Sequence, residues 1–141
     1  MSKTGEIFIV EDDADDRQFL EAIIRDLDIE NNIVWFDTTE EALNYLLTTT
    51  KSIFLLFSDI NLPGKNGLEF KKQIDSNPKL RKKSIPFVFY STMAYQKDVN
   101  EAFMEMTVQG FFKKGVDYDE TKRMMKTIFD YWKMSKHPNA Q

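Results

Sequence analysis

The chain of 141 residues contains no cysteine, which excludes a disulfide framework and a thiolate metal site and fits a reducing compartment. It also lacks any apolar run close to the roughly 18 residues that a membrane-spanning helix requires. Residues 1–5 lead into a strand-like run without the pattern of a signal peptide. These absences predict a cytoplasmic protein without a membrane partner.

Linkers, repeats and low-complexity segments are also missing, and 141 residues fit one domain of ordinary size. Hydrophobic residues make up 42% of the chain and charged residues 30%, a balance typical of globular proteins. We expect a folded domain over residues 1–135 and a short polar tail over residues 136–141.

A basic run comprises Lys71, Lys72, Lys79, Arg81, Lys82 and Lys83. Such a run is usually a solvated helix end and loop, so we predict no nucleic-acid partner.

Apolar or aromatic runs alternate with segments of helical periodicity along the whole chain. The runs predict strands over residues 6–10, 32–36, 53–58, 85–91 and 110–113. The periodic segments predict helices over residues 15–27, 40–47, 67–75, 97–106 and 117–133. Five strands alternating with five helices indicate an α/β fold, with a parallel sheet covered on both faces. Right-handed crossovers would bring the first and third strands side by side.

Acidic residues follow two of these strands directly. Glu11, Asp12 and Asp13 come after the first, and Asp59 comes after the third. Functional groups of such sheets gather outside the carboxyl ends of the strands, so we expect these carboxylates to converge. Like charges in a partly dry pocket are costly unless a cation joins them, and an oxygen-only ligand set suits Mg²⁺ or Mn²⁺. We predict that Glu11, Asp12 and Asp59 hold the metal together with the backbone carbonyl of Asn61.

A carboxylate nucleophile at a strand end can carry a phosphoryl group as an acyl phosphate, and Asp59 is the candidate. Lys114, after the fifth strand, is the candidate cation for the phosphate, and its neighbour Lys113 is the alternative. Ser91 ends the fourth strand and offers a hydroxyl to the phosphate, with Thr92 directly after it. In a functional interpretation, Ser91 moves toward a bound phosphate and Phe111 turns into the space that Ser91 vacates. The competing interpretations are that Asp59 merely begins a turn, that the other acids and Ser91 cap helices, and that Phe111 fills the core.

These positions together resemble the receiver domain of a two-component response regulator, from about residue 6 to residue 132. The strongest element is the segment Asp59-Ile60-Asn61-Leu62-Pro63-Gly64-Lys65-Asn66-Gly67, in which Pro63 and Gly67 would shape the loop. The resemblance implies a flavodoxin-like, doubly wound sheet in the order 2-1-3-4-5. It also implies the following roles: phosphorylation at Asp59, an acidic pair at Glu11 and Asp12, switch residues at Ser91 and Phe111, and a phosphate-contacting lysine at Lys114. Three departures from the family pattern are Glu11 in place of Asp, Gly115 in place of Pro, and a segment between Ser91 and Lys114 that is about one residue longer than usual.

The resemblance implies a signalling switch rather than an enzyme. A histidine kinase or phosphotransfer protein would phosphorylate Asp59 with Mg²⁺, and an unidentified downstream protein would read the change. The resemblance extends to stand-alone receivers, so we expect no output module. Candidate contact residues are Tyr95, Val99, Met104 and Met106. One alternative is a phosphorylation-independent interaction module. Another is a flavin or nucleotide binder, which is disfavoured because the acidic loop after the first strand would repel phosphate. A third is an aspartate-based phosphatase, which is disfavoured because Asn61 lacks the carboxylate that such an enzyme would use as general acid.

Overall fold

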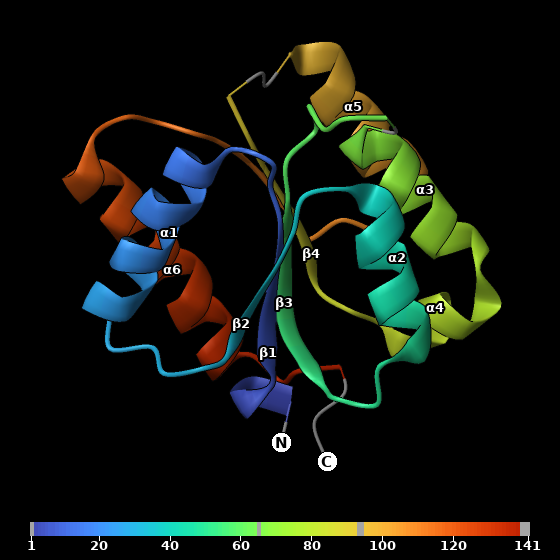
Figure 1. The fold of residues 1–141 in the computed structure, drawn as a ribbon, viewed down its shortest axis with the longest axis horizontal. Helices are drawn as coiled ribbons and strands as arrows, with labels where there is room; N and C mark the ends of the chain where they lie inside the picture. The colour runs from blue at the N-terminus through green and yellow to red at the C-terminus, as the bar shows by residue number, and fades with distance from the viewer. Residues whose placement is uncertain (1, 65, 93–94, 139–141) are drawn as a thin grey trace.

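A five-stranded parallel sheet forms the centre of the computed structural model, which describes residues 2–64, 66–92 and 95–138. The strands are β1 (Glu6–Val10), β2 (Ile33–Phe36), β3 (Ile53–Ser58), β4 (Phe87–Ser91) and β5 (Gly110–Lys113). Their order is β2-β1-β3-β4-β5, which confirms the predicted fold (Figure 1). The crossovers place β1 and β3 side by side, with Val10 opposite Ser58 at the carboxyl end of the pair.

Helices cover both faces of the sheet (Figure 1). They are α1 (Ala14–Asp26), α2 (Thr39–Thr48), α3 (Gly67–Ser76), α4 (Pro78–Lys83), α5 (Gln96–Glu105) and α6 (Tyr118–Met134), and a short 3-10 helix, η1 (Ser2–Thr4), precedes β1. Helices α1 and α6 pack on one face, and α2, α3, α4 and α5 lie on the other.

The short helix α4 is an addition to the five predicted helices. Asn77 starts it, because its side chain accepts hydrogen bonds from the backbone N–H groups of Lys79 and Leu80 at 3.0 and 3.3 Å. Pro78 occupies the first helical position, where its missing N–H has no cost. The segment was expected to be a loop because it is too short for helical periodicity to show.

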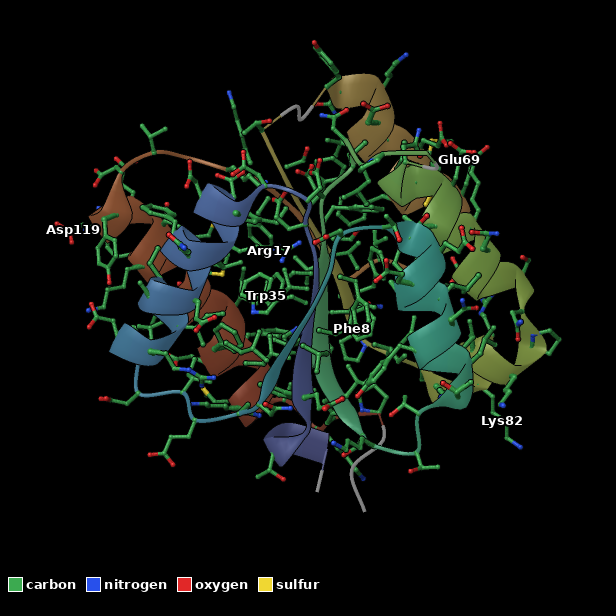
Figure 2. The ribbon with its side chains drawn as sticks, in the orientation of Figure 1. Phe8, Arg17, Trp35, Glu69, Lys82 and Asp119 are labelled. Carbon is green, nitrogen blue, oxygen red and sulfur yellow. The ribbon has the colours of Figure 1, made fainter. Side chains whose placement is uncertain are left out.

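Alternation along the strands builds one apolar layer on each face. Phe8, Leu56 and Phe89 face α2, α3 and α5, whereas Ile9, Phe57 and Tyr90 face α1 and α6. Figure 2 shows this alternation at Phe8, on the side of α2, and at Trp35, on the side of α1. Because the central strands β1 and β3 are buried on both faces, they present only their ends to solvent.

His137 lies in the segment that was expected to be a short polar tail, whose described part ends at residue 138. Its ring is buried against Phe54 and Trp132, with ring centroids 5.8 and 6.0 Å away. The Nε2 atom lies 2.8 Å from the carbonyl oxygen of Phe54, and because a carbonyl only accepts, Nε2 is the donor. His137 therefore packs as part of the core.

Lys71 departs from the predicted solvated basic run, because its side chain is only 3% exposed. Its ammonium donates to Thr107 Oγ1 at 3.0 Å, pairs with Asp75 Oδ1 at 2.9 Å and lies 4.9 Å from the ring centre of Phe87. Asp75 also accepts from the N–H and hydroxyl of Thr107, which fastens α3 to the segment before β5. Burial lowers the pKa of Lys71, and the hydrogen bond to Asp75 opposes that shift.

The pair of Lys71 and Asp75 predicts losses of stability of unequal size when either partner is removed. Asp75→Asn leaves the buried Lys71 ammonium without a counter-charge, and we expect a loss of about 3 kcal/mol in the free energy of unfolding. Lys71→Met leaves the Asp75 carboxylate 13% exposed and still bound by the N–H and hydroxyl of Thr107, so the loss should be clearly smaller. Urea denaturation of both variants measures the difference. An equal loss in Lys71→Met would contradict this account.

Candidate functional site

The predicted site residues follow the carboxyl ends of the strands, at the upper end of the sheet in Figure 1. Backbone hydrogen bonds continue the sheet for one residue beyond β1, β3 and β5. Glu11 N–H donates to Phe36 O at 2.9 Å, Asp59 N–H to Val10 O at 3.1 Å, and Lys114 N–H to Ser91 O at 2.9 Å. The positions of Glu11, Asp59 and Lys114 are therefore held by the sheet itself.

Asp59 is buried, and its two carboxylate oxygens have different surroundings. Oδ1 accepts hydrogen bonds from the backbone N–H groups of Ile60 and Asn61 at 2.7 and 3.2 Å. Oδ2 accepts from the ammonium of Lys114 at 2.9 Å. The N–H donors fix one oxygen and leave Oδ2 as the oxygen that meets the cation.

Lys114 connects the ends of three strands and the start of α1. Its ammonium donates to Glu11 Oε1, to Asp59 Oδ2 at 2.9 Å and to Asp16 Oδ2 at 3.0 Å. Burial disfavours the charged form, but the hydrogen bonds to Glu11 and Asp59 outweigh it and hold the pKa of Lys114 above its usual value. Lys113 is exposed at the end of β5, so the geometry brings Lys114 and not Lys113 into the site.

Glu11 is the other buried acid of the site. Burial raises the pKa of its carboxyl group to about 7, although the hydrogen bond from Lys114 acts in the opposite direction. Its second oxygen accepts from the backbone N–H of Asp13 at 3.2 Å. The site thus holds more negative charge than one ammonium neutralises.

Asp12 differs from Glu11, because it is exposed in the loop between β1 and α1. Capping of α1 falls to Asp13, whose side chain accepts from the N–H groups of Asp15 and Asp16. Over residues 2–64, 66–92 and 95–138, no group of three or more acidic or histidine side chains is arranged to hold a metal. The structure brings Glu11 and Asp59 together around Lys114, and it leaves Asp12 outside that cluster.

The remaining predicted residues lie around this cluster. Ser91 is buried at the end of β4, and Thr92 is exposed directly after it. Phe111 is half-buried and packs on Phe89, with ring centroids 5.4 Å apart. Ser91 follows Phe89 by two residues on one strand, so Ser91 and Phe111 belong to the same face of the sheet.

The loop after Asp59 depends on a close approach at Gly67, the first residue of α3. A Cβ at this position would lie 2.1 Å from the carbonyl oxygen of Asp59, and the N–H of Gly67 donates to Ile60 O at 2.8 Å. Asn66 and Glu69 form a reciprocal capping box that starts α3 directly after the loop that follows Asp59. Pro63 is exposed in this loop, next to Gly64 with φ +75°.

Two residues of the site were missed by reasoning from the sequence. Asp16 accepts from Lys114, and Arg17 donates from Nε to the carbonyl oxygen of Glu11 at 2.9 Å while its guanidinium pairs with Asp37. Figure 2 shows Arg17 reaching from α1 toward the sheet. The segment 11–16 contains five acids, which hides which of them faces inward, so only the orientation of α1 could reveal the contact of Asp16.

Comparison with known families agrees with this geometry. The response regulator receiver domain matches residues 7–126 of the chain. The chain belongs to this family. Receiver domains act in two-component systems, where histidine kinases phosphorylate them, and they are signalling phosphoacceptors rather than enzymes.

Individual relatives of the receiver domain support the same assignment. The response regulator Rcp1 of Synechocystis sp. (strain ATCC 27184 / PCC 6803 / Kazusa) is 24% identical over 131 residues, which cover 89% of this chain and 87% of Rcp1. The phosphorylated cyanobacterial phytochrome response regulator RcpA is 25% identical and superposes with a TM-score of 0.84 over 96% of this chain and 99% of its own.

Two further structures share the fold and contain a divalent metal. The Mn²⁺-bound form of Rcp1 is 24% identical, with a TM-score of 0.82 over 95% of this chain and 99% of its own. The receiver domain of the sensor histidine kinase PA1611 from Pseudomonas aeruginosa PAO1, with magnesium in its active-site cleft, is 18% identical, with a TM-score of 0.68 over 89% of this chain and 98% of its own.

In the described part of the present chain, no helix is long and apolar enough to span a membrane.

The contact at Gly67 predicts that a single methyl group displaces the loop after Asp59. Gly67→Ala places a Cβ against the Asp59 carbonyl, so the amide signals of Ile60 and Asn61 should shift in an NMR spectrum and stability should fall by about 2 kcal/mol. Gly64→Ala is the control, because it meets no atom within 4 Å and strains only its own backbone. Its effect on the amides of Ile60 and Asn61 should be absent, and equal shifts in both variants would refute the prediction.

Proposed function

We propose that this receiver domain accepts a phosphoryl group on Asp59 in a Mg²⁺-dependent reaction and thereby switches a protein-interaction surface. The observation that carries the proposal is the buried Asp59 carboxylate, whose Oδ2 meets the Lys114 ammonium at 2.9 Å. Asp59 lies at the carboxyl end of a central strand, where parallel sheets of this kind bind their ligands.

The two oxygens of Asp59 suit different tasks in this reaction. Oδ1 stays bound to the N–H groups of Ile60 and Asn61, so Oδ2 attacks the phosphorus of the donor. The new bond joins Oδ2 to phosphorus, the bond from phosphorus to the donor breaks, and the leaving group keeps that electron pair. Lys114 is then near enough to donate to an oxygen of the transferred group, with the hydroxyls of Ser91 and Thr92 as further donors.

The chemistry of the site fits a divalent cation. Burial raises the pKa of Glu11 to about 7, and three carboxylates contact a single ammonium, so added positive charge would stabilise the cluster. Glu11, Asp12, Asp59 and the backbone carbonyl of Asn61 would hold Mg²⁺ or Mn²⁺, which both prefer oxygen ligands. The ion supplies positive charge that offsets the repulsion between Asp59 and an incoming phosphate. Because Asp12 is exposed beside Glu11, its side chain is free to turn toward the ion.

The switch would run from the phosphoryl group to the face of β5. Ser91 moves toward the phosphoryl group, and Phe111 turns into the space that it vacates. The phosphoryl donor would be a histidine kinase or phosphotransfer protein, and a downstream protein would bind the altered face. Tyr95 and Met104 are exposed contact candidates, Val99 is half-buried, and Met106 is buried in the core and therefore unavailable to a partner. A cytoplasmic location accords with the absence of cysteine.

Phosphorylation by acetyl phosphate tests the acceptor directly. Wild-type protein with acetyl phosphate and Mg²⁺ should gain the mass of one phosphoryl group, and chelation of the metal with EDTA should abolish the gain. Asp59→Asn should gain nothing, because the nucleophilic carboxylate is gone. Asp28→Asn is the matched control, since Asp28 is exposed and has φ 59°, which asparagine also adopts readily. An unmodified wild type, or an equal adduct on Asp59→Asn, refutes the proposal and favours a phosphorylation-independent interaction module.

The two neighbouring lysines should differ sharply in the same assay. Lys114→Met removes the cation nearest to Asp59, and we expect phosphorylation to slow by roughly tenfold or more. Lys113→Met changes an exposed side chain at the end of β5 and should retain the wild-type rate. Thermal unfolding of both variants checks that each is folded at the assay temperature. Slowing of equal size in the two variants would show that Lys114 has no special role.

A further inference from the structure

Asp16 is a partner of Lys114 that the proposed reaction does not use. It lies in the first turn of α1, and its Oδ2 accepts from the Lys114 ammonium at 3.0 Å. Asp13 and not Asp16 caps the helix, since the Asp13 side chain accepts from the N–H groups of Asp15 and Asp16. The contact with Lys114 therefore calls for its own explanation.

The ammonium of Lys114 has three N–H donors, and three carboxylates accept from it. They belong to Glu11, Asp16 and Asp59. A phosphoryl oxygen can receive a hydrogen bond from Lys114 only when one of these carboxylates releases it. The order of release depends on how strongly each carboxylate holds the ammonium.

Exposure distinguishes the three carboxylates. The side chains of Glu11 and Asp59 are 7% and 8% exposed, and that of Lys114 is 6% exposed. The Asp16 side chain is 43% exposed, so water screens its attraction to the ammonium. Asp16 is thus the weakest of the three partners.

We propose that Asp16 is a positioning residue, which restrains the Lys114 ammonium in the unphosphorylated protein and competes with the phosphoryl group for it. This inference rests on the proposed function of Asp59. Loss of the Asp16 carboxylate has two effects, and both favour binding of the incoming phosphate. It frees one N–H donor of Lys114, and it removes a negative charge that repels the incoming phosphate.

The contact itself is tested in the metal-free protein, without any phosphodonor. The NMR signal of the Lys114 Cε methylene, assigned by its loss in Lys114→Met, should shift in Asp16→Asn because one carboxylate leaves the ammonium. Asp15→Asn is the matched control, since Asp15 carries the same charge one residue away and is exposed on the same turn. An unchanged signal in Asp16→Asn, or equal shifts in both variants, overturns the inference.

The restraint is tested by phosphorylation with acetyl phosphate and Mg²⁺. Asp16→Asn should lower the acetyl phosphate concentration for half-maximal rate by about two- to fivefold, the effect of one partly screened ion pair. Asp16→Glu keeps the charge and should restore the wild-type value, and Asp15→Asn should match wild type. In a Lys114→Met background, Asp16→Asn should have a clearly smaller effect, because the restrained group is absent and only the repulsion between Asp16 and phosphate is relieved.

The outcomes separate this inference from the proposed function. A wild type that takes a phosphoryl group on Asp59, together with an Asp16→Asn variant that behaves like Asp15→Asn, overturns the restraint and leaves the acceptor role standing. A gain of equal size with and without Lys114 also overturns it, since the effect would then be general charge repulsion. A wild type that takes no phosphoryl group refutes the acceptor role, and the competition for Lys114 is refuted with it.

Discussion

The contact between the Lys114 ammonium and the carboxylates of Glu11 and Asp59 is the interaction on which the rest of this structure depends. Two buried acids at neighbouring strand ends repel each other, and each loses hydration on burial. The ammonium offsets both costs, and its hydrogen bonds keep its own charge in spite of burial. Since Glu11, Asp59 and Lys114 follow β1, β3 and β5, the same interaction joins the carboxyl ends of these three strands and holds the candidate site together.

Helix α3 extends this arrangement across one face of the sheet. Its first residue, Gly67, sits against the Asp59 carbonyl, and near its last turn Asp75 binds the N–H and hydroxyl of Thr107. Thr107 precedes β5, the strand that carries Phe111. Lys72 adds ion pairs to Glu101 and Glu105 of α5. Contacts of α3 therefore connect the loop after Asp59 with both the segment before β5 and helix α5.

Much of the fold was predictable from the sequence, because alternating strand and helix patterns permit few topologies. The strand order and the position of Asp59 at a strand end follow from that pattern together with the family resemblance. The direction of single side chains was not predictable in the same way. Lys113 and Lys114 are both basic, and only the end of β5 decides which of them turns inward. Lysine side chains are usually solvated, yet Lys71 is buried because Asp75 and Thr107 bind its ammonium.

The exposure of Asp12 and the contact of Asp16 have a similar cause. Both belong to one acidic run, and the start of α1 at Ala14 determines which acids face the site. The helix turns Asp16 toward Lys114 and leaves Asp12 in the preceding loop. Hydrophobic periodicity locates such a helix to within a few residues, and an error of one residue rotates every side chain by about 100°.

The buried ring of His137 and the helix η1 lie at the pole where the strands begin (Figure 1). The ammonium of Lys3 donates to the carbonyl oxygen of Lys133 at 2.6 Å, which joins the two ends of the described chain. Asp59 lies at the opposite pole. A fluorescent reporter fused before η1 or after His137 would project away from Asp59, so tagged versions of the protein should leave the surroundings of Glu11, Asp59 and Lys114 open to a partner.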